Sequence, residues 1–91
     1  MSIQLLKKDE RGRVYQCNGF KLFYRIKNSV SGNNDTNLEE KIYVITGTIE
    51  VTRNAETKII NAPEYTEIPA NTYHKITAVT DTSFIVLDNK K

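Results

Sequence analysis

Short segments in which apolar and polar residues alternate make up most of the chain. The clearest is 20–27, with Phe20, Leu22, Tyr24 and Ile26 at the even positions and Lys21, Phe23, Arg25 and Lys27 at the odd ones. A period of two is typical of a strand with one buried face. We expect the even-numbered side chains to face the interior and the odd-numbered ones to face water.

Turn-forming residues separate further segments of this kind. Strands are predicted at 3–6, 13–17, 38–46, 48–53, 57–61, 64–68, 73–79 and 83–88. Gly47, 54–56 and 80–82 supply turns between them. No long segment carries a helical apolar period. About eight short antiparallel strands at this spacing predict an all-β sandwich or barrel, in one domain over 1–91.

Composition and charge narrow the class of protein. The chain has 91 residues, of which 38% are hydrophobic and 26% charged, as in a small globular domain. Its apolar runs are too short to span a membrane. The net charge of +2 is spread along the chain, and the basic stripe of strand 20–27 is explained by a solvated strand face. We therefore expect no nucleic-acid partner and no membrane partner.

The single cysteine indicates a reducing compartment. Cys17 has no second cysteine with which to form an internal disulfide, and the N-terminal segment lacks the apolar core of a signal peptide. We expect the protein to be cytoplasmic and Cys17 to be a small buried or half-buried hydrophobe.

Two polar residues stand out because each belongs to a strand-like run near a tight turn. Glu40 is followed after six residues by Gly47, and His74, the only histidine, ends the segment 69–74 (PANTYH). Strand parity places Glu40 on one face with Ile42 and Val44, and it places His74 with Ile76 and Ala78. One polar group on an otherwise apolar face is how a barrel wall presents a site to its interior.

The order of these residues resembles the two motifs of the cupin superfamily over about residues 20–88. The second half of the first motif is a glutamate, six residues and a glycine, as in Glu40 to Gly47. The second motif is proline, any residue, glycine, two residues and histidine. It matches Pro69 to His74 with Asn71 in place of the glycine, and asparagine tolerates a positive φ. The resemblance implies a double-stranded β-helix barrel, or jelly roll.

The resemblance also implies a metal site, but the chain departs from it there. The two family histidines of the first motif fall on Asn34 and Thr36, or on Asn33 and Asp35 in the variant that is one residue longer. Iron, manganese, nickel or zinc would therefore have Glu40, His74 and Asp35 as protein ligands. The alternative is that no cofactor binds, and that Glu40 and His74 hydrogen-bond to each other or to water.

Three functions remain open at this point. The first is a small-molecule-binding or regulatory protein with its ligand in the barrel mouth and the segment 28–37 as a lid. Its ligand-binding residues would be Tyr24, Asn34, Thr36, Glu40 and His74. The second is a cupin enzyme, metal-dependent or a metal-free isomerase or epimerase, that uses Glu40 and His74 as acid and base on a carbohydrate-like or small polar substrate. The third is a protein-interaction module with a filled barrel.

Two strands are apolar on both faces. Tyr43 and Ile45 lie opposite the interior residues of their strand, and Phe84 and Val86 lie opposite Ile85 and Leu87. A strand that is apolar on both sides is covered on both sides. We therefore expect a homodimer that packs sheet on sheet.

Overall fold

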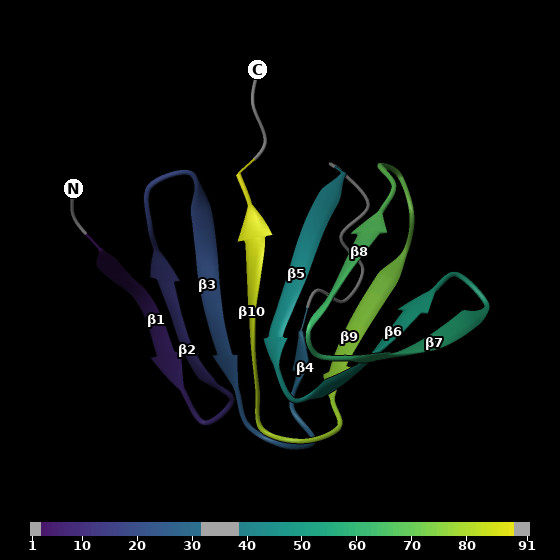
Figure 1. Ribbon diagram of the computed structural model, residues 1–91, viewed down its shortest axis with the longest axis horizontal. Coiled ribbons are helices and arrows are strands. Elements are labelled where there is room, and N and C mark those ends of the chain that lie inside the picture. Colours follow the sequence, from purple (N-terminus) through teal and green to yellow (C-terminus); the bar gives the residue numbers. More distant parts are fainter. Residues whose placement is uncertain (1–2, 32–38, 89–91) are drawn as a thin grey trace.

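The structure is a computed structural model that describes residues 3–31 and 39–88. Within these residues it contains ten strands, all paired antiparallel, in two sheets (Figure 1). The six-stranded sheet runs in the order β1 (Gln4–Asp9), β2 (Gly12–Gln16), β3 (Phe20–Arg25), β10 (Thr82–Leu87), β5 (Glu40–Thr46) and β8 (Glu64–Ile68). The four-stranded sheet runs in the order β4 (Val30–Ser31), β9 (His74–Ala78), β6 (Thr48–Arg53) and β7 (Glu56–Asn61).

The predicted all-β fold is confirmed, with ten strands among the described residues where about eight were predicted. The two-residue strand β4 lies in the segment 28–37, which the sequence indicates as a loop, and it pairs with β9. A polar, glycine-containing segment carries no alternation from which so short a strand could be predicted. Among the described residues no helix is long and apolar enough to cross a lipid bilayer.

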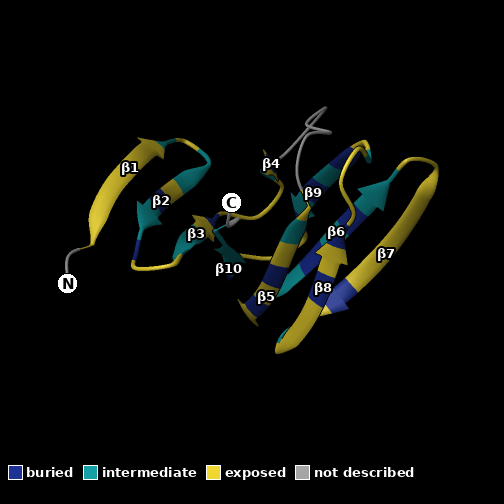
Figure 2. Cartoon of the chain, turned by 90° about the horizontal axis from the view of Figure 1, so that it is seen from above, coloured by how far each residue is buried: buried dark blue, intermediate teal, exposed yellow. Residues whose placement is uncertain are grey.

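The core lies between the two sheets. Its buried side chains come from alternate positions of the facing strands and are Ile42, Val44, Ile49, Val51, Ile60, Ile68, Ile76 and Phe84. Figure 2 shows buried positions where the two sheets face each other, while the β1–β2 hairpin extends beyond the four-stranded sheet. Strand β1 is mostly exposed, and β2 is mostly half-buried. The wider sheet therefore leaves part of its surface without a covering layer.

Residues with positive φ make the turns that the motifs predict. Gly47, between β5 and β6, has a φ of 81°, and a Cβ there would lie 2.3 Å from the carbonyl oxygen of Asp81. Asn71, which stands at the glycine position of the second motif, has a φ of 59°. Asparagine is one of the few residues that adopt this conformation readily, so the turn before β9 is retained.

The predicted facing of strand 20–27 is wrong, because its odd-numbered residues point inward. Phe23 stacks on Phe84 with ring centroids 4.8 Å apart, and Arg25 is only 5% exposed. Tyr24 and Ile26, expected inside, are 43% and 50% exposed. Long basic side chains can line an interior along their methylene stems, so their presence does not mark a solvated face.

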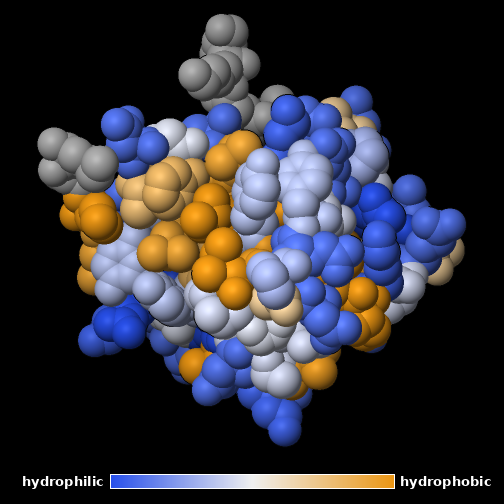
Figure 3. Space-filling view, viewed as in Figure 1, coloured by the Kyte–Doolittle hydropathy of each residue, from blue (hydrophilic) through white to orange (hydrophobic). Residues whose placement is uncertain are grey.

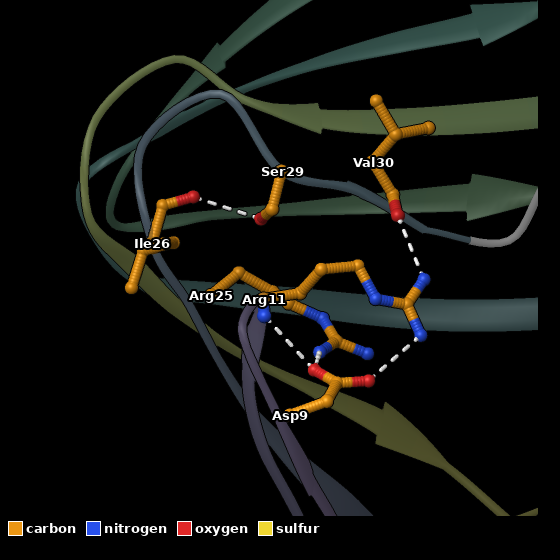
Figure 4. Close-up of polar contacts among 6 residues, drawn as sticks. All are labelled: Asp9, Arg11, Arg25, Ile26, Ser29 and Val30. Carbon is orange, nitrogen blue, oxygen red and sulfur yellow. Dashed lines mark hydrogen bonds and ion pairs between the residues drawn. The ribbon is translucent and has the colours of Figure 1, made fainter.

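A cluster of charged residues ties the β1–β2 turn to β4 (Figure 4). The Asp9 carboxylate accepts hydrogen bonds from the Arg11 backbone at 2.9 Å and from its guanidinium at 3.2 Å. Arg11 also donates to the carbonyl of Val30 at 3.1 Å. The buried Arg25 lies 4.0 Å from the same carboxylate, and burial is the main cause that lowers its pKa. The cluster thus joins the two sheets at this end of the molecule.

Candidate functional site

Glu40 and His74 begin strands on opposite sheets and point into the space between them. Glu40 is the first residue of β5 and His74 the first of β9. The alternate residues that follow each of them, such as Ile42 and Ile76, are buried in the core. The two polar groups point toward each other, and His74 Nε2 lies 3.7 Å from Glu40 Oε1.

The backbone orients the His74 ring. Nδ1 lies 3.2 Å from the carbonyl oxygen of Thr72, which can only accept, so Nδ1 carries a proton. Nε2 therefore directs either a lone pair or, in the imidazolium, a proton toward Glu40. The side chain of His74 is 1% exposed, and its Nε2 has no hydrogen-bond partner among the residues that the structure describes. The distance to Glu40 exceeds a hydrogen bond and suits an ion pair when the ring is protonated.

A cavity of about 220 Å³ opens beside this pair. Its lining consists of Lys21, Phe23, Ser31, Glu40, Ile76, Phe84, Val86, Leu87 and Asp88. Aromatic and aliphatic side chains form most of its wall, and the polar groups are few. Glu40 reaches the cavity and is a quarter exposed, whereas His74 is buried and does not line it. A ligand in the cavity would therefore meet the carboxylate directly and the imidazole only through it.

An ion pair that no sequence motif indicates lies at the same cavity. Lys21 Nζ is 3.5 Å from Asp88 Oδ1, and Gln16 donates to the other oxygen of Asp88 at 3.0 Å. The Gln16 amide also donates to the carbonyls of Cys17 and Phe20, which holds it in place. The sequence pattern assigned Lys21 to the solvent-exposed face of its strand, so it could not predict that this side chain lines the cavity. Asp88 belongs to no sequence motif. Their pairing depends on β3 lying beside β10.

The structure does not bring every predicted residue to this cavity. Tyr24 lies on the opposite face of β3, where it lines a different, shallow hollow, and this placement corrects its expected role. Asn33, Asn34, Asp35 and Thr36 lie outside the described residues, as does most of the predicted lid 28–37. Of that segment, Ser31 lines the cavity. Cys17 is buried and forms no disulfide with another described residue, and its burial agrees with the expected small hydrophobe.

The described residues supply two metal donors at this site, Glu40 and His74. Nowhere in 3–31 or 39–88 do three or more histidine, cysteine, aspartate or glutamate side chains gather closely enough to hold a metal ion. Protein sites for zinc and similar divalent ions use at least three protein ligands. These residues alone therefore do not complete a metal centre, and the third expected ligand, Asp35, falls outside them.

Two antiparallel sheets enclose a cavity that Glu40 lines, with His74 buried behind Glu40. Comparison with solved structures identifies this arrangement as the cupin fold. A cupin superfamily protein from Desulfitobacterium hafniense has a TM-score of 0.68 and 14% identity, over 97% of this chain and 77% of that one. KdgF from a Halomonas species has the same TM-score and 16% identity, over 93% of this chain and 74% of that one. A protein of unknown function from Vibrio parahaemolyticus has a TM-score of 0.77 and 15% identity, over 96% of this chain and 98% of that one.

These similarities cover nearly the whole chain and establish that it has the cupin fold. No protein-family model matches the sequence, and no curated protein matches it. The predicted double-stranded β-helix is therefore confirmed as a fold, while the activity depends on the chemistry of the site itself.

Proposed function

We propose that the protein binds a small molecule in the cavity beside Glu40. The single observation that supports this proposal is the cavity itself, because a volume of about 220 Å³ stays open between two otherwise closely packed sheets. Ligand sites of this kind are mostly apolar, with a few polar groups that orient the ligand. The mixture of Phe23, Phe84 and Val86 with Glu40 and Lys21 matches that description.

The lining indicates the chemistry of the ligand. An apolar body would pack against Phe84 and Val86, and a hydroxyl or ammonium group would donate to the Glu40 carboxylate. A carboxylate or phosphate on the ligand would compete with Asp88 for Lys21, which is 43% exposed and able to turn toward it. A small amphipathic molecule with a hydrogen-bond donor and an acidic group therefore fits the cavity best.

The enzyme alternative rests on the pair of Glu40 and His74. A proton held between the two groups could pass to a ligand through Glu40, which would then act as general acid or base. The buried imidazole would position that carboxylate rather than touch the substrate, since His74 does not line the cavity. The alternative of an interaction module with a filled barrel is disfavoured by the open volume.

Binding is tested by thermal denaturation with a set of small carboxylates, hydroxy acids, sugars, amino acids and nucleotides. A ligand that binds the native state raises the midpoint as its concentration rises. We expect Glu40→Gln and the cavity-filling Val86→Phe to lose this shift. Glu50→Gln is the matched control, because Glu50 lies on β6 and does not line the cavity.

Two outcomes would contradict the proposal. One is that no compound in the set shifts the wild-type midpoint. The other is that Glu40→Gln and Val86→Phe respond to a ligand as Glu50→Gln does. A metal requirement is separated by adding a chelator or divalent ions without any ligand. We expect the midpoint to stay unchanged, whereas a metal-dependent enzyme would melt at a lower temperature with the chelator.

A further inference from the structure

The outer face of the six-stranded sheet carries an unbroken row of apolar and aromatic side chains. Cross-strand pairing sets side by side, from β1 to β8, the residues Leu5, Tyr15, Leu22, Ile85, Tyr43 and Tyr65. Leu5, Tyr43 and Tyr65 are 49%, 42% and 40% exposed. Figure 3, which views this face, shows apolar side chains gathered over its middle.

The two central strands present no charge on this face. On this face of β3 and β10, both fully within the described residues, Leu22 lies beside Ile85 and Tyr24 beside Ser83, whereas Leu87 at the end of β10 lines the cavity. A nucleic acid would need basic side chains at the centre of its contact surface. An antiparallel sheet that faces water normally places polar residues there. A partner with an apolar contact surface of its own therefore suits this face.

The two halves of the face differ in shape. On one half, a shallow hollow of about 290 Å³ is lined by Ile3, Arg13, Tyr15, Leu22 and Tyr24. Its aromatic wall is built by Tyr15 and Tyr24, which meet edge to face with ring centroids 6.1 Å apart, and Arg13 lies over the Tyr24 ring. On the other half, the exposed rings of Tyr43 and Tyr65 lie 4.8 Å apart. One half is thus concave, and the other offers exposed aromatic rings to fill it.

We propose that a second copy of this chain packs on this face, related by a two-fold axis parallel to the strands. Such a rotation lays β1 over β8, β2 over β5 and β3 over β10. Leu22 then meets Ile85 of the second copy at the centre. Tyr43 of the second copy lies over Tyr15 and enters the hollow. The row has aliphatic residues at its centre and tyrosines on both sides, so it complements itself, as an isologous interface must.

The area of the face agrees with a weak specific dimer. Five strand spacings give a width of about 24 Å, and six residues give a length of about 20 Å. Two copies would thus cover about 1,000 Å² in projection, near the lower limit for a specific interface. We expect a dissociation constant in the micromolar range rather than an obligate dimer.

Sedimentation equilibrium over a range of micromolar concentrations tests the dimer. We expect a mass that rises from one chain to two for the wild type. Tyr43→Lys should weaken the association by at least about tenfold, because it removes an aromatic ring and places a second positive charge beside Arg13 in the hollow. Ile59→Lys is the matched control, since Ile59 is 51% exposed but lies on β7 of the other sheet.

Cross-linking tests the orientation of the two copies. Within one chain, β2 and β5 are three strand spacings apart, or about 14 Å. A thiol linker shorter than this distance should join two chains when each carries both Tyr15→Cys and Tyr43→Cys. It should not join two chains of either single variant. The wild type should also stay unlinked, because its cysteine, Cys17, is buried. Circular dichroism verifies that each variant is folded, and the cysteine pair keeps the test valid if Tyr43→Lys does not fold.

Three results would overturn the proposal. They are a single-chain mass at every concentration, a dimer that Ile59→Lys disrupts and Tyr43→Lys does not, or equal cross-linking in the single and double cysteine variants. Sedimentation with vesicles of neutral phospholipid, in a sample that stays monomeric without them, would assign the face to a membrane surface instead. None of these results depends on ligand binding in the cavity.

Discussion

The imidazole of His74 and the carboxylate of Glu40 approach to 3.7 Å across the gap between the two sheets. Thr72 holds the far side of the ring through its carbonyl oxygen, so the ring has a defined orientation. Only the carboxylate reaches the cavity. The two residues therefore have different roles, since the buried imidazole positions the carboxylate and the carboxylate contacts a ligand in the cavity.

This division of tasks predicts unequal effects of substitution on stability. His74→Ala should lower the free energy of unfolding by about 2–4 kcal/mol, because it leaves a void in a closely packed interior. Glu40→Gln should change it by less than about 1 kcal/mol, because the amide keeps the shape and can donate to His74 Nε2. Urea denaturation measures both, with Glu50→Gln as control. Equal losses at the two positions would contradict these separate roles.

The charged cluster at the β1–β2 turn predicts a response to acid. The hydrogen bond from the Arg11 backbone is the largest cause that lowers the pKa of Asp9, and the guanidinium adds to it. A carboxylate with a lowered pKa stabilises the folded state above its unfolded pKa, and this contribution disappears as the pH falls through the folded value. We expect Asp9→Asn to destabilise the protein at pH 7 and to reduce the further loss of stability below about pH 4.

Denaturant midpoints at pH 7 and at pH 3 give that comparison. Asp81→Asn provides a second carboxylate substitution outside the cluster. An unchanged acid response in Asp9→Asn would show that the cluster does not contribute.

Tyr65 should ionise well above its ordinary range. Its hydroxyl donates a hydrogen bond to Glu67, which is the main cause that raises the pKa of Tyr65 to about 12. The phenol is held in its neutral form, so its stabilising contribution is present below pH 10 and is lost as the pH rises toward 12. Ultraviolet absorbance titration should show one tyrosine ionising near pH 12. In Glu67→Gln that step should move toward pH 10, and a titration curve identical to wild type would exclude the hydrogen bond as the cause.

The turn before β9 should tolerate glycine at position 71 better than alanine. Asn71 has a φ of 59°, and a residue with a Cβ generally loses about 1 kcal/mol or more in this region. We expect Asn71→Gly to keep or slightly raise the stability and Asn71→Ala to lower it by about 1 kcal/mol. Thermal melts of the two variants provide the comparison. A more stable alanine variant would mean that this turn adopts another conformation.

Much of the site was accessible from the alternation of residues alone. Around Glu40 and His74 the neighbouring alternate positions hold isoleucine, valine or alanine, so each of the two residues could be assigned to an apolar strand face. The positive φ of Asn71 was also predictable, because the glycine position of the motif requires a residue that adopts positive φ. By contrast, strand 20–27 carries aromatic residues on both faces, and its basic side chains have long apolar stems that can be buried. The buried face of this strand was therefore assigned wrongly.

The sequence by itself determined every described strand except β4, the main turns and the two faces that carry Glu40 and His74, because these are local consequences of a two-residue period and of backbone sterics. Only the tertiary structure decided that Lys21 pairs with Asp88 and that six strands align their outward residues in one row. Strand order and register set both features, and they depend on contacts between segments far apart along the chain. A local pattern carries no information about which strands become neighbours.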